Sequence, residues 1–158
     1  MRTKKAKTRE VTPDLKYGSV LVSRLINRSM RDGKKSVAQK QVYTALEMVA
    51  EKTGKKPVEV LQEAIQNITP QMEVRSRRVG GASYQVPMPV REKRAASLAV
   101  RWLVLESNKL PNKEFHSYAE KLASEILGAL DNTGGAIEKK AGSHRMAEAN
   151  KAFSHFRW

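Results

Sequence analysis

The sequence predicts a mainly α-helical domain, in which six helices form a bundle and a β-hairpin arm protrudes between helices three and four. Apolar residues recur at helical spacing along most of the chain, with glycine, proline and Asx residues between the repeats. One stretch instead alternates with a period of two around a Gly-Gly dipeptide. The 158 residues predict a single domain (1–158), since a chain of this length buries enough surface for one core.

The predicted arm covers residues 72–90. Residues 74–79 are β-branched and basic, and Gly80-Gly81 is a turn dipeptide because glycine reaches positive φ without a steric clash. Residues 84–90 then return with a period of two. We therefore expect a two-stranded ribbon.

Two prolines and three arginines distinguish this ribbon. Pro87 and Pro89 are two residues apart, so their missing N–H groups are expected on the same unpartnered edge. Arg75, Arg77 and Arg78 crowd one strand, and no acidic residue follows Glu73 within the stretch. Two interpretations remain open from this pattern alone: an arm that lies against an anionic partner, or a small solvated hairpin that covers the core.

The helices are expected in order, each with its own boundary signal. They begin near Ser19, Ser36, Pro57, Arg91, Phe115 and Thr133, and a last helical segment covers 146–158. Ser19 is a candidate N-cap. Asp32-Gly33 and Gly54 are expected to end the first two helices, because glycine adopts the left-handed C-cap conformation. Pro57 suits the first turn of the third helix and Pro70 stops it.

The expected core consists of the apolar residues at helical spacing. They are Leu21, Leu25, Ile26, Ala38, Val42, Ala45, Leu46, Val49, Val60, Leu61, Ala64, Ile65, Ile68, Leu98, Ala99, Trp102, Leu103, Leu105, Phe115, Tyr118, Ala119, Leu122, Ala123, Ile126, Leu127, Leu130, Ala149, Ala152, Phe153 and Phe156. Lys151, His155 and Arg157 are expected on the outer face of the last segment.

The charge of the chain predicts a polyanionic partner. Lys and Arg number 30 against 16 Asp and Glu, which gives a net charge of +14. Residues 1–12 form an aperiodic basic tail that is expected to be flexible until it meets a phosphate backbone. With no apolar run of about 18 residues, we expect no membrane partner.

Catalytic and cofactor motifs are not found in the sequence. There is no Cys, and none of His116, His144 and His155 lies four residues from another, so no helix offers a two-histidine metal face. Gly80-Gly81 lacks the Lys-Ser/Thr of a P-loop. We expect no metal, no cofactor and no enzymatic activity.

Four segments resemble one known family in the same order along the chain. They are 77–87 (RRVGGASYQVP), 144–153 (HRMAEANKAF), 31–36 (RDGKKS) and 99–103 (AVRWL). The resemblance is to the seventh protein of the small ribosomal subunit, bacterial and organellar type, and it covers essentially the whole chain. It implies a six-helix bundle with a β-ribbon arm between the third and fourth helices.

The resemblance also implies a function in the ribosome, in the cytoplasm or in an organelle. Such a protein binds the 3′ major (head) domain of small-subunit rRNA and nucleates its assembly, and its arm and C-terminal helix lie near the E-site tRNA, the mRNA exit path and neighbouring head and platform proteins. The residues expected at rRNA are Arg2, Lys4, Lys5, Lys7, Arg9, Lys34, Lys35, Arg75, Arg77, Arg78, Arg91, Lys93, Arg94 and Arg101. Those expected near tRNA or mRNA are Val79, Gly80, Gly81, Ala82, Tyr84, His144, Arg145, Lys151, Arg157 and Trp158.

Two other classes compete with this interpretation. An architectural DNA-bending protein also joins a helical body to a basic, proline-bearing β-arm. The lysine-rich tail, the length of the helical body and the family motifs favour rRNA over DNA. An enzyme acting on RNA would need a metal or nucleophile constellation, and the sequence contains none.

Overall fold

The computed structural model describes residue 6 and residues 10–157, and the described chain is mainly helical. Its elements are α1 (Val20–Ser29), α2 (Lys35–Thr53), α3 (Pro57–Ile68), β1 (Met72–Val79), β2 (Ala82–Pro89), α4 (Glu92–Lys109), α5 (Tyr118–Leu130), α6 (Gly135–Ala149) and a 3-10 helix, η1 (Lys151–Phe156). The predicted helical bundle with a hairpin between α3 and α4 is confirmed. The predicted rRNA contacts Arg2, Lys4, Lys5, Lys7 and Arg9 and the tRNA-proximal Trp158 lie outside the described residues.

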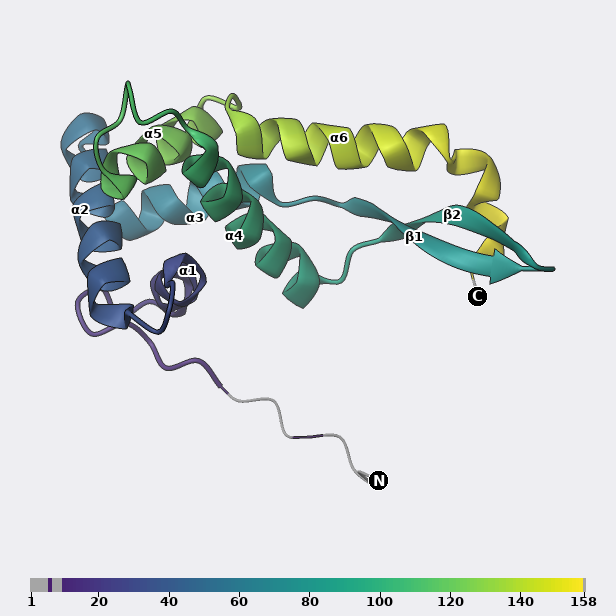
Figure 1. Ribbon diagram of the computed structural model, residues 1–158, viewed down its shortest axis with the longest axis horizontal. Coiled ribbons are helices and arrows are strands. Elements are labelled where there is room, and N and C mark those ends of the chain that lie inside the picture. The colour runs from purple at the N-terminus through teal and green to yellow at the C-terminus, as the bar shows by residue number, and fades with distance from the viewer. Residues whose placement is uncertain (1–5, 7–9, 158) are drawn as a thin grey trace.

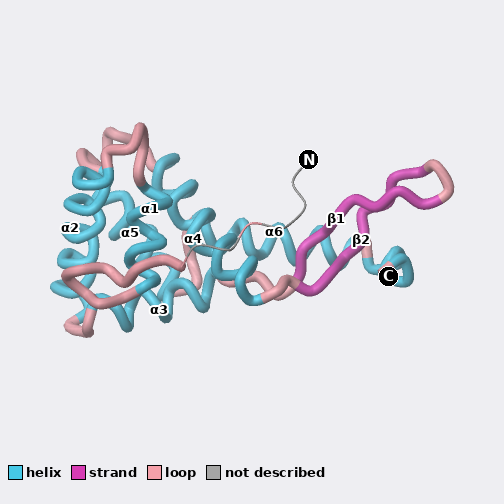
Figure 2. Tube along the Cα trace, turned by 90° about the horizontal axis from the view of Figure 1, so that it is seen from below, coloured by secondary structure: helices cyan, strands magenta, loops and turns pink. Residues whose placement is uncertain are grey.

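The helices α1 to α5 form a body, and α6 leaves it alongside the hairpin (Figure 1). Viewed from below, the body and the hairpin occupy opposite ends of an elongated molecule, with η1 next to the hairpin (Figure 2). Helix α5 packs against α2, α3 and α4, and its Leu122 and Ile126 are fully buried. Helix α5 contacts α6 as well, so its buried face is shared by four helices.

The predicted inner faces of α1, α2 and α3 are nearly all buried, but α4 is turned relative to the prediction. Ala99 and Leu103 are buried as expected, together with Val100 and Val104. Leu105, predicted in the core, is 44% exposed and that prediction is wrong. The buried apolar residues of α4 lie four residues apart in two series, one through Ala99 and Leu103 and one through Val100 and Val104. Leu105 belongs to neither series.

Several predicted boundaries are also wrong. Helix α1 ends at Ser29, because the chain becomes extended at Met30 (φ −61°, ψ 134°), and Asp32 and Gly33, with positive φ (50° and 73°), form a separate turn. Helix α5 begins only at Tyr118, where the Ser117 hydroxyl accepts the Glu120 N–H at 3.2 Å, so Phe115 precedes the helix and is half-buried. Leu98 and Trp102 are half-buried as well.

The C-terminal segment differs from the prediction of a helix over 146–158. Helix α6 continues unbroken to Ala149, and the chain then tightens into the 3-10 helix η1. The side chain of Asn150 donates to the Met146 carbonyl at 2.8 Å at this junction. Ala149 and Ala152, predicted inside, are exposed, whereas Phe153 and Phe156 are half-buried.

The buried carboxylate of Glu125 and two glycines determine how α6 starts. Glu125 of α5 accepts the Ala136 N–H at 2.7 Å, in place of a capping side chain from Gly134. Gly134 has φ 90° and ψ 167°, a region that is essentially restricted to glycine. A Cβ at Gly135 would lie 3.1 Å from the Glu106 side chain. The lack of side chains at these two glycines lets α6 start directly against α4 and α5.

Glu125 generates a pH-dependent prediction. Burial raises its pKa, and the charges of Glu106 and Glu138 raise it further, against the hydrogen bond from the Ala136 N–H. An acid whose pKa is higher in the folded state destabilises the fold at neutral pH, and this cost vanishes as the pH falls toward the unfolded value of 4.5. Glu125→Gln, which keeps an acceptor, is expected to raise the free energy of unfolding at pH 7 by about 1 kcal/mol.

Urea unfolding at several pH values measures this difference. The gain of Glu125→Gln over the wild type should shrink between pH 7 and pH 4.5. A variant that is less stable than the wild type at pH 7 would show that the charge of Glu125 is needed to hold α6.

Candidate nucleic-acid interface

The hairpin has the geometry that its glycines predict. Val79 pairs with Ala82 across a two-residue turn, in which Gly80 and Gly81 have φ of 57° and 91°. Positive φ at both turn residues matches the right-handed twist of the strands. We call residues 72–89 the arm. The arm therefore ends in a tight two-residue turn.

The two prolines of the arm lie on the edge that the sequence predicts. The Val90 N–H donates to the Gln71 carbonyl at 2.9 Å, which fixes the alternation of hydrogen-bonded and non-hydrogen-bonded pairs. Pro87 and Pro89 pair with Val74 and Met72 in the non-hydrogen-bonded positions. Both proline nitrogens thus face the outer edge of β2, as predicted.

The arm packs against the C-terminal segment of the chain. The ring of Tyr84 lies 5.3 Å from that of Phe153 and 5.2 Å from that of Phe156. Arg157 donates through Nε to the Pro87 carbonyl at 2.6 Å, and Val86 is completely buried. Tyr84 and Arg157, predicted near tRNA, thus have contacts within the protein that hold the arm.

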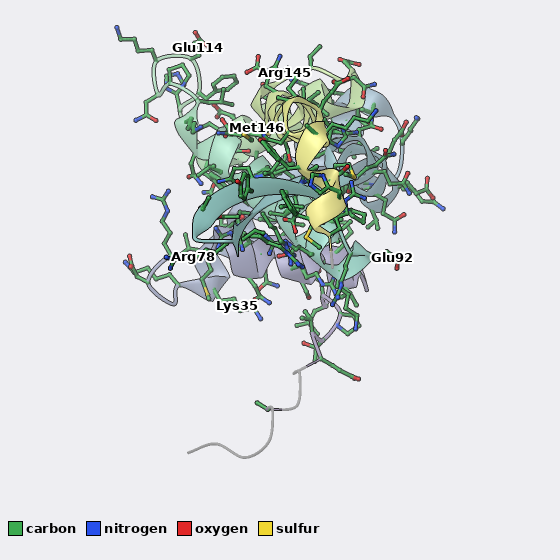
Figure 3. The ribbon with its side chains drawn as sticks, turned by 90° about the vertical axis from the view of Figure 1, so that its right-hand side faces the viewer. Lys35, Arg78, Glu92, Glu114, Arg145 and Met146 are labelled. Atoms are coloured by element: carbon green, nitrogen blue, oxygen red, sulfur yellow. The ribbon has the colours of Figure 1, made fainter. Side chains whose placement is uncertain are left out.

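Helix α6 holds the base of the arm. The Ser143 hydroxyl donates to the Met72 carbonyl at 3.0 Å, and His144 Nε2 accepts the Gln71 N–H at 3.1 Å. This bond requires an unprotonated His144 Nε2. Arg145, the next residue, is exposed, and Figure 3 shows it on the side of the molecule opposite Lys35.

A buried carboxylate ties the arm to α4. Glu73 of β1 accepts hydrogen bonds from Arg94 Nε at 2.7 and 2.9 Å and from Arg75 Nε at 2.7 Å. Burial alone would raise the pKa of Glu73, but the hydrogen bonds from Arg94 and Arg75 outweigh it and hold the pKa below its ordinary value. Two predicted rRNA contacts therefore also form an ion-pair cluster at the base of the arm.

A basic cleft lies on the surface where α1 packs against α4. It has a volume of about 370 Å³, and its walls carry four cations, Arg24 and Arg28 from α1 with Lys93 and Arg101 from α4. All four residues are exposed. Lys93 lies in the first turn of α4, directly after the arm, so this α1/α4 cleft continues the basic surface of the arm base.

The other predicted residues are distributed along the same elements. Lys34, Lys35, Arg78, Gly80, Gly81, Ala82, Arg91 and Lys151 are exposed, and Arg77 and Val79 are half-buried. Lys34 lies with Arg31 beside a second, smaller hollow between α1 and α2. The structure brings Lys93 and Arg101 close to the arginines of α1, and it brings Arg75 close to Arg94. Arg145 and Lys151 belong to α6 and η1 and are not part of these two groups.

Sequence reasoning missed Arg24 and Arg28. These arginines are four residues apart, on the helix face opposite Leu25 and Ile26, and this spacing was the available signal. It also missed the roles of Glu73 and Ser143, because no local pattern indicates a partner that is distant in sequence.

Metal-binding and membrane-spanning features do not occur within the part of the chain that the structure describes. No group of three or more histidine or acidic residues there could hold a metal ion. No described helix is sufficiently long and apolar to cross a bilayer. The basic surface is thus the candidate site of this part of the molecule.

Comparison with known families decides the classification. The family described as ribosomal protein S7p/S5e matches residues 1–151. The chain belongs to this family. Small ribosomal subunit protein uS7 of Thermosipho melanesiensis is 57% identical over 158 residues, and that of Thermotoga maritima is 53% identical, each covering 100% of both chains. The uS7 of Caldanaerobacter subterraneus is 56% identical over 150 residues, which are 95% of this chain and 94% of the relative.

Membership in the S7p/S5e family confirms several predictions. The chain is a structural constituent of the small ribosomal subunit, and in bacteria this subunit is cytoplasmic. The family consists of ribosomal proteins without enzymatic activity, so the predicted non-enzymatic role is confirmed.

The contact between the arm and the C-terminal segment generates a prediction about local stability. Phe153→Ala removes one of the two rings against Tyr84, and an aromatic pair contributes about 0.5–1.5 kcal/mol beyond its buried area. Amide hydrogen exchange in β2 around Val86 should become about 3- to 10-fold faster, while α5 is unchanged. Lys151→Ala, on the same 3-10 helix but exposed, is the matched control. Equal exchange rates in the two variants would show that the ring contact does not hold the arm.

Proposed function

We propose that this S7-family protein binds the 3′ major (head) domain of small-subunit rRNA as a primary binder that nucleates its assembly. The observation that carries the proposal is the α1/α4 cleft, where two helices from different parts of the chain place four cations around one hollow. Arginine forks suit the phosphate oxygens of such a ligand.

The shape of the surface favours RNA over duplex DNA. Double-stranded RNA presents a wide, shallow minor groove with its flanking phosphates, and proteins recognise it largely by shape. The arm is held against α6 and η1 by Arg157, Ser143 and three aromatic rings. A fixed arm matches a ligand with a fixed fold, whereas an arm that bends DNA inserts into a minor groove and kinks it.

The tip of the arm supports a second part of the proposal. The arm and the C-terminal segment lie near the E-site tRNA and the mRNA exit path, next to neighbouring head and platform proteins. Gly80, Gly81 and Ala82 are exposed at the end of the arm that is remote from the helical body. An exposed backbone turn without bulky side chains allows close approach of an RNA strand.

The rRNA proposal predicts a selective loss of affinity when the cleft arginines are replaced. Arg24→Ala with Arg28→Ala should weaken binding to head-domain rRNA at about 0.2 M salt by at least about tenfold. The slope of log K against log salt should fall by about 0.7–0.9 for each phosphate that the variant no longer neutralises. Filter binding over a salt series measures both quantities.

Lys55→Ala with Lys56→Ala is the matched control, because it removes the same charge at the far end of α2. This helix has 19 residues and is therefore about 28 Å long. Equal losses of affinity in the two double variants would show that the cleft contributes only net charge and is not a specific binding site. Equal affinity of the wild type for duplex DNA and for head-domain rRNA would favour the DNA-binding class instead.

The tRNA proposal can be tested with a single crosslinker, because the chain has no cysteine of its own. Ala82→Cys carrying a short photo-crosslinker should label E-site tRNA in assembled subunits. Lys55→Cys, in the α2–α3 connection, should give no tRNA product. Labelling of tRNA by both variants, or by neither, would contradict the placement of the arm tip.

A further inference from the structure

The one acidic residue of the arm is in an unexpected place. Glu73 is the sole carboxylate between Met72 and Pro89, and it is 7% exposed. A negative charge on a segment that approaches phosphates opposes binding by simple electrostatics. Its burial between cations indicates a role through the residues that it holds.

Glu73 holds each guanidinium by one edge. Arg75 contacts Glu73 Oε1 with both Nε (2.7 Å) and Nη2 (2.6 Å), and Arg94 contacts both carboxylate oxygens through Nε, at 2.7 and 2.9 Å. A guanidinium has five N–H donors in a rigid plane, so these contacts leave most donors of both side chains available. The Arg75 and Arg94 side chains are each 49% exposed, so both side chains reach solvent.

The carboxylate also offsets the repulsion between the two cations. Arg75 comes from β1 and Arg94 from the first turn of α4, so without Glu73 two like charges would meet where the arm joins the body. With it, the cluster of Glu73, Arg75 and Arg94 keeps a net charge of +1 and a fixed geometry. Side chains that are already ordered lose less entropy when a ligand binds.

We propose that Glu73 is a positioning residue that holds Arg75 and Arg94 as one preformed site for a backbone phosphate of RNA at the base of the arm. This inference rests on the proposed rRNA binding and names one anchoring point within it. Lys93 lies next to Arg94 and on the wall of the α1/α4 cleft, so a strand in the cleft reaches this site without leaving the basic surface.

The test asks whether an added positive charge at Glu73 strengthens or weakens RNA binding. Glu73→Gln adds one positive charge to the interface, and on charge alone the full-length protein would bind head-domain rRNA more tightly. A positioning role predicts the opposite, a loss of about tenfold at about 0.2 M salt. Glu92→Gln is the matched control: Glu92 is exposed in the first turn of α4 (Figure 3), and its removal adds the same charge without touching the arginines. It should bind as tightly as the wild type or more tightly.

A double-variant cycle shows whether Glu73 acts through Arg94. Arg94→Lys keeps the charge but loses the planar fork, and it should also weaken binding. The combined variant should lose less than the product of the two single losses, since both substitutions remove the same site. Circular dichroism at the assay temperature monitors the helices. If Glu73→Gln lowers the helix signal, Arg94→Lys alone decides the question.

The outcomes separate this inference from the proposed function. Unchanged or tighter binding by a folded Glu73→Gln, or unchanged binding by Arg94→Lys, overturns the phosphate site and leaves rRNA binding in place. Independent losses in the cycle also overturn it. A wild type that does not prefer head-domain rRNA overturns the proposed function itself.

Discussion

A two-stranded ribbon cannot hold a direction in water by itself, because it buries too little apolar surface. This constraint explains the end of the molecule that carries the arm. Helix α6 bonds to the base of the arm through Ser143 and His144, η1 places two phenylalanine rings against Tyr84, and Glu73 ties β1 to α4. Three separate elements thus determine one orientation, and the arm becomes an extension of the helical body.

Apolar and cationic residues serve different parts of the same elements. In α1, Leu25 and Ile26 are buried while Arg24 and Arg28 line the cleft, and in α4 Val100 is buried beside the exposed Arg101. The apolar face stabilises the body at roughly 25 cal/mol for each Å² removed from water. The opposite, solvent-facing side of these helices carries the cationic side chains. A net charge of +14 therefore coexists with an apolar core.

The sequence was informative where the physical cause is local. Gly80-Gly81 specified the turn and Pro57 the start of α3, because each depends on the conformation of a few residues. It was uninformative where the cause is tertiary. The orientation of α4 depends on its packing against α1, α3, α5 and α6, so Leu105 was misplaced. The contact between Arg157 and the Pro87 carbonyl spans 70 residues of sequence, and no periodicity indicates it. For the candidate site, the cationic positions of α4 and the arm were predictable from composition, but their grouping around Glu73 and with α1 was not.

The 3-10 helix η1 follows every other described element along the chain, so synthesis delivers it after the arm that it supports. Chains emerge from the translating ribosome N-terminus first, so α1 to α5 and both strands are available before Phe153, Phe156 and Arg157. The nascent protein can complete its bundle while the ribbon is still unsupported on one side. Phe153, Phe156 and Arg157 then add their contacts with β2 to those that α4 and α6 already make with the arm. A chain shortened before η1 would keep the bundle, and its arm would be held by α4 and α6 alone.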